Sequence, residues 1–401
     1  ITSGAFFFRT TDLVLPGPRP VAFIRTYRSR DVRRTAMGWS MSHNFEVSLQ
    51  GDAQTYLILN SPGNYRQRFT VHPNDTALPV GSRRFLNTTD PWLRGAVLTG
   101  YFNSNGLTLR FRDGLTWKFN AQGYLIADTD RQGRTITITR DTSNRVTKIT
   151  NTAGQSLTLT YSGWFVASVS DPQGRTVRYT YKGWGLLQEL MDTVTHPDGS
   201  VTQYRYFKDR GWLWQVINPR GIAEVENLYD TTSSARGRVI RQEHADGGAY
   251  TYAYTTDAQG YIPEARVTDP MGQVWPTRFN TAGYEVSRTD PRGNTTTYLR
   301  DPATNLQTGV TDALGRTTTW TYDGLGNIAT VTGPDRSTTT STYEPTYSQV
   351  TSVTNALGRV TQYGYDAQGN LTQITDPLGN GTQIGYNALG QPVRITDPLG
   401  N

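Results

Sequence analysis

The chain has 401 residues and a formal net charge of +6, with 35% hydrophobic residues, 18% charged residues and no cysteine. The lack of cysteine excludes a disulfide framework, a thiolate nucleophile and a Cys-ligated metal site, and no apolar run approaches the ~18 residues of a membrane-spanning helix. The composition also excludes general disorder, because 23 Tyr, 13 Phe and 9 Trp supply enough apolar surface to offset the entropy of ordering the chain.

The first 120 residues contain strand-like runs without a repeat. These runs are FFFRT (6–10), VAFIRTY (21–27), FEVSL (45–49), TYLIL (55–59) and LTLRFRDG (107–114). Residues 60–105 are richer in Pro, Asn and Gly, so we predict loops there. We divide this part into an N-terminal β domain at 1–75 and irregular connecting strands and loops at 76–120. Because terminal units of repeat proteins are atypical, we expect it to cap or begin the sheet that follows.

Six arginines lie between Arg19 and Arg34. Such a cluster can bind nucleic acid or a membrane surface. The cluster is short and charge elsewhere is mixed, so we favour a solvated face of strand and loop.

From residue 121 onward a turn signal recurs about every 21 residues. Its clearest copies are TDPMG (268–272), TDPRG (289–293), TDALG (311–315), TNALG (354–358) and TDPLG (375–379 and 396–400). A second turn lies halfway along each unit, as in YDGLGN (322–327) and YDAQGN (365–370). Asp or Asn starts such turns and Gly accepts the positive φ that they require. A fixed period of this kind predicts a repeat architecture of turn, strand, turn, strand.

The first strand of each unit alternates cleanly. In RVTQYGYD, Thr361, Tyr363 and Tyr365 share one face and polar residues share the other, which is typical of a half-buried antiparallel sheet. In the second strand Leu371 and Ile374 are three residues apart, which places them on opposite faces of a regular strand. A bulge or a strong twist would reconcile this spacing.

Hairpins of this kind must stack, because a lone two-stranded hairpin is barely stable in water. A propeller, a closed barrel or a curled ribbon would each cover the aromatic face and protect the end strands. Propeller blades use about 40 residues in four strands, so the shorter period favours a continuous spiral. We therefore predict an all-β fold, a spiral of antiparallel hairpins over 121–401. LLQELMDTV (186–194) can take a helical turn, but we assign it to a strand.

No catalytic constellation is evident. His43, His72, His196 and His244 are scattered, and none is at metal-ligand spacing from another. The chain lacks GxSxG, HExxH and a phosphate-binding glycine loop. The repeated Asp residues, with Asp128 and Asp130 in DTDRQG, faintly suggest calcium ligands, but turn chemistry explains them better. We predict no catalytic, cofactor-binding or metal-binding residue and no cofactor.

Residues 359–380, RVTQYGYDAQGNLTQITDPLGN, resemble the unit of the bacterial Rhs, or YD-repeat, family, and the pattern covers roughly 120–401. TTDLVLPGPRPVAFIRTYRSR (10–30) and GWSMSHNFEV (38–47) are similar to the small domain that precedes the repeats in those proteins. The resemblance implies part of a hollow β-shell wound from one spiral ribbon, with Tc-toxin components and teneurins as relatives.

The resemblance also implies a function. We expect a non-enzymatic shell that encloses a C-terminal toxin domain, absent from this chain, and delivers it in bacterial competition or toward a host. The expected partners are this cargo, components of a secretion apparatus such as type VI secretion, and a chaperone, with no specific nucleic acid and no membrane span in this segment. The protein would be secreted after export from a bacterium. The alternative is a cell-surface adhesion protein that binds glycan or protein through its repeats.

The Tyr and Trp ladder has three interpretations. Aromatic faces can stack sugars or bases, but packing within the sheet is favoured, and inward-facing residues of a shell would also hold a cargo partly unfolded. The family's self-cleavage motif is PxxxxDPxGL. Pro392 to Gly400 fits its spacing, but Asn401 stands where Leu is expected and DPLG is an ordinary repeat turn, so we expect no cleavage there. We interpret the chain as an excerpt that does not close a shell alone.

Overall fold

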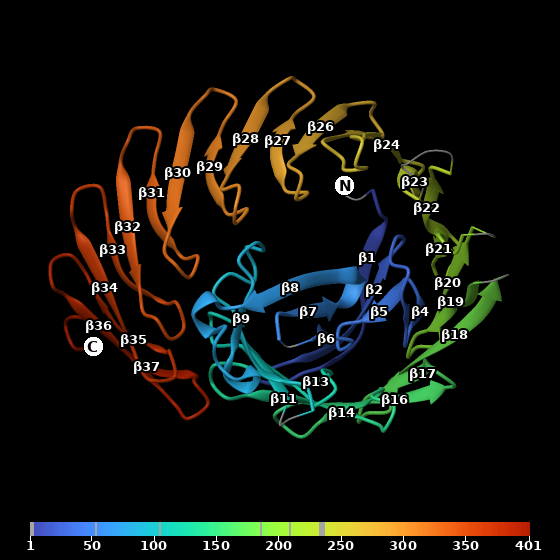
Figure 1. Cartoon of the computed structure of the whole chain (residues 1–401), viewed down its shortest axis with the longest axis horizontal. Helices are drawn as coiled ribbons and strands as arrows, with labels where there is room; N and C mark the ends of the chain where they lie inside the picture. The colour runs from blue at the N-terminus through green and yellow to red at the C-terminus, as the bar shows by residue number, and fades with distance from the viewer. Residues whose placement is uncertain (1–3, 53, 104–105, 185–186, 208–209, 232–236) are drawn as a thin grey trace.

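The computed structural model describes residues 4–52, 54–103, 106–184, 187–207, 210–231 and 237–401. Strands β6–β37 form one antiparallel sheet of 32 strands, beside a three-stranded sheet of order β1-β2-β5 and a two-stranded sheet β3-β4. Figure 1 shows the long sheet as a ribbon of hairpins that curls around the N-terminal strands. The predicted all-β spiral is confirmed.

The N-terminal part of the chain consists of short strands and three 3₁₀ turns. They are β1 (Phe7–Leu15), β2 (Val21–Arg28), β3 (Arg34–Thr35), β4 (Gly38–Trp39), β5 (Met41–His43), β6 (Ser48–Gly51), β7 (Tyr56–Ser61), η1 (Pro62–Asn64), β8 (Tyr65–Val71), η2 (Pro73–Asp75), η3 (Val80–Ser82), β9 (Arg84–Leu86), β10 (Val97–Tyr101), β11 (Gly106–Arg110) and β12 (Thr116–Phe119).

The prediction of loops over residues 60–105 was wrong for β8, β9 and β10, which are paired strands of the long sheet. In β8 the outward side chains are Arg66, Arg68 and Thr70 and Gln67 shares the inward face, so the strand lacks an apolar signature although Phe69 is completely buried. Some of the turn residues that suggested loops lie in η1, η2 and η3, and others, such as Pro91 and Gly95, lie between β9 and β10.

The repeats supply the remaining strands. They are β13 (Leu125–Thr129), β14 (Thr135–Arg140), β15 (Val146–Thr150), β16 (Ser156–Ser162), β17 (Phe165–Ser170), β18 (Thr176–Trp184), β19 (Leu187–Thr195), β20 (Val201–Tyr206), β21 (Leu213–Ile217), β22 (Ala223–Tyr229), β23 (Val239–His244), β24 (Ala249–Thr255), β25 (Glu264–Thr268), β26 (Val274–Phe279), β27 (Glu285–Thr289), β28 (Thr295–Arg300), β29 (Gln307–Thr311), β30 (Thr317–Tyr322), β31 (Ile328–Thr332), β32 (Thr338–Tyr343), β33 (Val350–Thr354), β34 (Val360–Tyr365), β35 (Leu371–Thr375), β36 (Gly381–Tyr386) and β37 (Pro392–Thr396). The strand assigned to 186–194 is confirmed by β19 from Leu187 onward, and residue 186 lies outside the described residues.

The N-terminal part both begins the sheet and fills its curl. Strand β6 starts the sheet and also meets the turn between β12 and β13, where Leu49 N–H donates to Gly123 O (2.7 Å) and Leu125 N–H donates to Val47 O (3.1 Å). Strands β1, β2 and β5 do not cap an end strand. They lie inside the curl, against the inner face of the ribbon (Figure 1). Of the two alternatives expected for residues 1–120, that they cap or begin the sheet, the second is confirmed by β6 and the strands that follow it.

A bulge reconciles the irregular spacing of the second strand in each unit. Tyr363 pairs with Ile374, but Tyr365 pairs with Leu371, so Thr372 is an extra residue. The bulge rotates the strand by one position and returns Leu371 to the face of Ile374. The same register shift occurs between β14 and β15 and between β30 and β31. The bulge hypothesis is confirmed.

The tyrosine of the YD signature holds neighbouring hairpins together. Its hydroxyl donates to the carbonyl oxygen 15 residues earlier, as in Tyr161 to Val146 (2.8 Å) and Tyr365 to Val350 (2.8 Å). At two equivalent positions arginine replaces tyrosine, and Arg140 and Arg300 donate to carbonyls at the same separation. These bonds satisfy a carbonyl that the bulge removes from the ladder.

The repeated Asp residues are turn residues. Asp376 Oδ1 accepts from the N–H groups of Leu378 and Asn380, both at 2.8 Å, and Gly379 has φ +87°. Asp366 makes the equivalent bonds in the other kind of turn. Each carboxylate therefore fixes its own turn, as the turn-chemistry prediction states.

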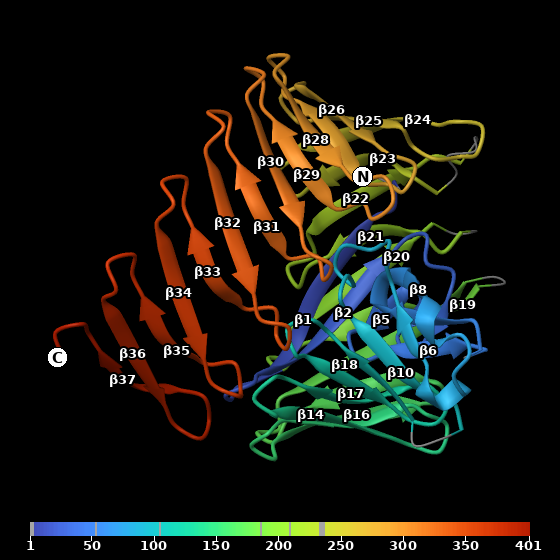
Figure 2. The same ribbon diagram turned by 60° about the vertical axis from the view of Figure 1, so that its left-hand side comes forward.

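The two kinds of turn lie on opposite edges of the ribbon. We call YD rim the edge formed by turns such as 323–326 and 366–369, and TD rim the edge formed by turns such as 312–315 and 376–379. Strands β10–β27 form a first coil and β28–β37 a second coil. Figure 2 shows the hairpins of the second coil fanning out from the first.

The second coil rests on the beginning of the ribbon through its YD rim. Arg112 donates to Gly326 O (2.7 Å), and Arg110 donates to Thr346 O (2.6 Å). Asn305 donates to Thr89 O (3.3 Å). Arginine side chains near the start of the sheet thus bind the exposed carbonyls of later turns, which fixes the pitch of the spiral.

Candidate functional site: the inner wall of the ribbon

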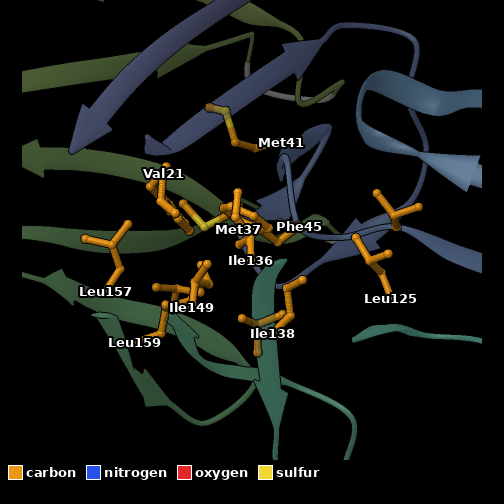
Figure 3. Packing of buried hydrophobic residues seen from close by; sticks show 14 of the residues in the cluster. Val21, Met37, Met41, Phe45, Leu125, Ile136, Ile138, Ile149, Leu157 and Leu159 are labelled. Carbon is orange, nitrogen blue, oxygen red and sulfur yellow. The ribbon is translucent and has the colours of Figure 1, made fainter. Parts of the chain in front are cut away.

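The inner face of the first coil is covered by the N-terminal strands. Phe23, Met37 and Met41 are completely buried and belong to one apolar cluster with Ile149 and Leu157 of the ribbon. Figure 3 shows such side chains meeting between the two layers. This aliphatic and aromatic contact accounts for most of the core.

A buried ion pair between β1 and β2 is hydrogen-bonded to two tyrosines of this wall. Arg25 donates to both oxygens of Asp12 (2.6 and 2.9 Å) and to the hydroxyl of Tyr204 (3.0 Å). Asp12 also accepts from the hydroxyl of Tyr179 (2.6 Å). Both charged side chains are 1% exposed. Burial, and then the Asp12 carboxylate, raise the pKa of Tyr179, so the hydroxyl remains a donor.

This network was not predicted from the sequence. A signal for it exists, because Val21, Phe23, Arg25 and Tyr27 share one face of β2 and arginine is out of place on such a face. Asp12 is the extra residue of a bulge in β1, where Thr11 pairs with Ile24 and Leu13 with Phe23. A bulge re-aims a side chain, and here the carboxylate reaches Arg25.

Backbone hydrogen bonds also join the two layers. The N–H groups of Val166 and Val239 donate to the carbonyls of Ala36 (2.9 Å) and Gly4 (2.8 Å). Leu213 N–H donates to the buried Tyr27 hydroxyl (2.8 Å). The contact therefore has a fixed register, which apolar packing alone does not give.

The arginine cluster of residues 19–34 is a solvated face only in part, since Arg30 and Arg34 are exposed. Arg25 is buried, Arg19 pairs with Asp128 (2.7 Å), and Arg34 pairs with Glu189 (2.5 Å). Asp128 and Glu189 lie on the ribbon, so two arginines of the cluster bind the wall, whereas Arg33 pairs with Asp31 beside it. The preferred prediction is thus corrected for Arg19 and Arg25: the sequence does not show partners more than 100 residues away, such as Asp128 and Tyr204.

A second buried polar cluster lies where residues 33–46 meet the YD rim. The Glu46 carboxylate accepts from the N–H groups of Ala36 (2.6 Å) and His43 (2.9 Å). Burial raises the pKa of Glu46 to about 7, and these two donors oppose the rise. Burial, and then the charge of Arg140, lower the pKa of His43 to about 3. The cluster lines a cavity of about 340 Å³ with Arg33 and Arg140.

These two groups give opposite pH dependences to stability. The folded chain binds fewer protons at His43 than the unfolded chain, so His43 lowers the free energy of unfolding by about 2 kcal/mol when the pH falls from 7 to 5. The folded chain binds more protons at Glu46 than the unfolded chain, so Glu46 raises the free energy of unfolding by about 2 kcal/mol over the same pH interval. We expect His43→Asn to become more stable on acidification than wild type by about this amount, measured by urea unfolding at both pH values. Parallel pH profiles of the two proteins would contradict this assignment.

The same inner face is uncovered in the second coil. Along the chain, the last apolar residue that is buried is Phe279, and every later residue to 401 is described. Trp320, Tyr363 and Ile374 are half-buried, and Ile395 is 67% exposed. An apolar face this long is unusual on a protein surface without a partner.

The outer face is polar. Cross-strand hydroxyl pairs such as Thr289 with Thr295 (2.8 Å) and Thr311 with Thr317 (2.9 Å) run along it. The ladder tyrosines Tyr179 and Tyr204 lie on the inner face, where they pack against the N-terminal strands.

The residues considered for metal or catalytic chemistry stay apart. His196 bonds Thr202 (2.9 Å), His244 contacts Tyr250, and His72 accepts from Asn74 N–H (3.2 Å). Asp130 fixes its own turn by accepting from Arg134 N–H (2.9 Å). Asp128 is not a turn residue, since it pairs with Arg19, so the turn interpretation is corrected for it.

No cluster of three or more His, Asp or Glu side chains at metal-binding distance occurs among the residues with described positions. In the same parts of the chain, no helix is both long and apolar enough to traverse a bilayer. At 392–400, Asp397 accepts from the N–H groups of Leu399 and Asn401 (both 2.9 Å), the bonding of an ordinary repeat turn.

Comparison with known proteins agrees with this architecture. The model of the domain of unknown function DUF6531 matches residues 1–69, and the RHS repeat model matches residues 279–317, 301–338 and 348–381. No curated protein sequence matches the chain.

Among solved structures, TcdB2-TccC3 without its hypervariable C-terminal region is similar, with a TM-score of 0.50 and 11% identity over 98% of this chain and 24% of that chain. TcdB2-TccC3-TEV is similar with a TM-score of 0.50 and 11% identity over 97% of this chain and 24% of that chain. The present chain thus spans about a quarter of the length of these proteins. The RHS repeat matches and the hairpin spiral that they build place the chain in the Rhs, or YD-repeat, family, with a fold shared with Tc-toxin components.

Proposed function

We propose that these residues form part of the wall of a non-catalytic shell that encloses a polypeptide cargo, a C-terminal toxin domain outside this sequence. The observation that carries the proposal is the uncovered inner face of β28–β37. In the first coil the same face is filled by chain, and burial of apolar surface favours filling the second coil as well.

The covered half indicates what kind of cargo fits. Its occupant is bound by apolar side chains, a few backbone hydrogen bonds and the hydrogen bonds that join its internal Arg25–Asp12 pair to Tyr204 and Tyr179 of the wall. A folded cargo would present mostly polar surface to the wall, whereas a partly unfolded polypeptide exposes the apolar side chains that match Tyr363 and Ile374. The function would be steric: the wall separates the cargo's active site from the cytosol of the producing cell.

Delivery follows from this role. A toxin released only outside the producer requires export, so we propose a bacterial secretion apparatus and a chaperone as partners and an extracellular destination. The competing proposal, adhesion through glycan or protein bound to the repeats, would use the polar outer face. The distribution of apolar residues on the inner face favours enclosure.

The experiment compares the complete gene product under native and denaturing conditions. If the wall encloses a cargo, the C-terminal region co-elutes with residues 1–401 in native size exclusion and resists protease, but becomes sensitive once denaturant opens the shell. A C-terminal region digested at the same rate with and without denaturant would contradict enclosure and favour adhesion.

A further inference from the structure

A cavity of about 750 Å³ lies between the N-terminal sheet and the first strands of the ribbon. Thr26 of β2 lines one side of it, on the face of the strand opposite to Arg25 and therefore away from the wall. Tyr65 of β8 and Trp117 of β12 line another side. Strands β2 and β8 lie inside the curl (Figure 1), so the cavity does too. Its volume is typical of a ligand pocket.

Aromatic rings form much of the lining of this cavity. The ring of Trp92 has its centroid 5.9 Å from that of Tyr65 at an angle of 74°, and 6.3 Å from that of Trp117 at 59°. Rings at such angles present both faces and edges to the cavity, unlike a flat stack. Tyr284, from the turn between β26 and β27, lines the cavity from the far end of the first coil. We call Tyr65, Trp92 and Trp117 the aromatic cage.

A buried carboxylate without a cation lines the same cavity. Asp90 is 7% exposed. Its Oδ2 accepts from the Tyr65 hydroxyl (2.6 Å) and its Oδ1 from the Trp92 N–H (2.8 Å), and it has no ion pair among the residues that the structure describes. A buried carboxylate is normally paired, because an isolated charge is costly to desolvate. A carboxylate offers about four acceptor positions, so two neutral donors leave room for a cation.

Of the described residues that line the cavity, only Arg9 carries a positive charge. Its guanidinium lies over the ring of Phe7 (5.3 Å) and does not pair with Asp90. Guanidinium groups elsewhere in the chain lie over tyrosine rings of the repeats, as Arg145 does over Tyr161 (4.6 Å). The same kind of contact, made by a cation from outside residues 1–401, would supply the charge that Asp90 lacks.

We propose that the aromatic cage and Asp90 form a binding site for an organic cation, the guanidinium or ammonium group of an Arg or Lys side chain of the enclosed polypeptide. The cargo as the source of the cation rests on the proposed function, whereas the chemistry of the site does not. Aromatic faces attract such groups, most strongly where water is excluded, and the carboxylate adds a charge-assisted hydrogen bond. A divalent metal ion does not fit, because it requires several oxygen ligands and Asp90 is the one carboxylate of the described lining.

The first test titrates residues 1–401 with two peptide probes in a calorimeter. The probe acetyl-Leu-Arg-Leu-amide carries the cation, and its neutral counterpart carries citrulline, an uncharged isostere of arginine. We expect only the cationic probe to bind. Asp90→Asn keeps the size of the side chain and should weaken binding by about tenfold or more. Equal binding of both probes, or no binding of the cationic probe, would overturn the proposal whether or not a cargo is enclosed.

A second variant tests the cage without removing the carboxylate. Trp92 is 55% exposed, so Trp92→Leu should fold, and it should weaken binding of the cationic probe about tenfold. Trp164→Leu is the matched control, because Trp164 is 61% exposed and does not line this cavity, and it should bind like wild type. Arg9→Gln removes the competing charge, so binding should be unchanged or tighter. Weaker binding by Arg9→Gln would indicate an anionic ligand and overturn the proposal.

The source of the cation is identified in the complete gene product. The photo-reactive amino acid benzoylphenylalanine replaces Trp92, and the products of irradiation are mapped by mass spectrometry. We expect cross-links to a peptide from beyond residue 401 that contains Arg or Lys. Cross-links confined to residues 1–401 would overturn the assignment of the site to a cargo side chain. Enclosure itself is measured by protease resistance, so a failure of this inference and a failure of the proposed function give different results.

Discussion

Replacing Arg25 with methionine is expected to lower the free energy of unfolding by about 3–5 kcal/mol. The substitution keeps an apolar side chain of similar length but leaves the Asp12 carboxylate buried without its cation. Tyr204 lies on strand β20, so the substitution also removes one hydrogen bond between the N-terminal sheet and the wall. Urea unfolding followed by tryptophan fluorescence measures the change.

Two further variants show whether the loss comes from the unpaired charge. Asp12→Asn combined with Arg25→Met removes both charges and should be closer to wild type than Arg25→Met alone. Arg241→Met breaks an exposed pair with Glu243 and should cost at most about 1 kcal/mol. A similar small loss for Arg25→Met would mean that the buried carboxylate does not depend on its cation.

Gly38→Ala is expected to destabilise the protein by about 3 kcal/mol or more. Gly38 has φ +89°, and a Cβ there would lie 2.5 Å from the Glu189 carbonyl oxygen on β19. The left-handed conformation costs a residue with Cβ about 1–2 kcal/mol, and displacing a backbone carbonyl adds about 1–3 kcal/mol of overpacking. The measurement is urea unfolding, with hydrogen exchange of β4 as a local probe.

Gly174→Ala is the matched control. Gly174 has φ +83°, but nothing lies within 4 Å of its added Cβ. This variant reports the conformational cost alone, about 1–2 kcal/mol. Equal losses for the two variants would show that the N-terminal strands do not approach the wall as closely as the structure indicates.

The sequence was sufficient for the parts of the fold that depend on local chemistry. Asp376 and Gly379 determine a turn by themselves, and the period of such turns predicts hairpins and a spiral. The three-residue spacing of Leu371 and Ile374 pointed to a bulge because side chains in a strand have a period of two. Each inference used residues that are neighbours along the chain.

The remaining features depend on contacts between distant residues. Asp128 and Glu189, the partners of Arg19 and Arg34, lie 109 and 155 residues further along the chain. The place of β1, β2 and β5 inside the curl depends on the curvature of the whole ribbon. The sequence predicted an aromatic face of the ribbon from local alternation. It did not predict that the N-terminal strands cover this face only in the first coil, because that also depends on the curvature of the ribbon.

The most direct test of enclosure uses two single thiols on adjacent residues of β35. Ile374→Cys places a thiol on the inner face, and Gln373→Cys places one on the outer face, since Gln373 pairs with Gly364 and Ile374 with Tyr363. In residues 1–401 alone, both thiols should react with a maleimide. In the complete gene product, the account predicts that the thiol at 374 is protected and the thiol at 373 still reacts. Equal reactivity of the thiol at 374 in both proteins would contradict an occupied inner wall.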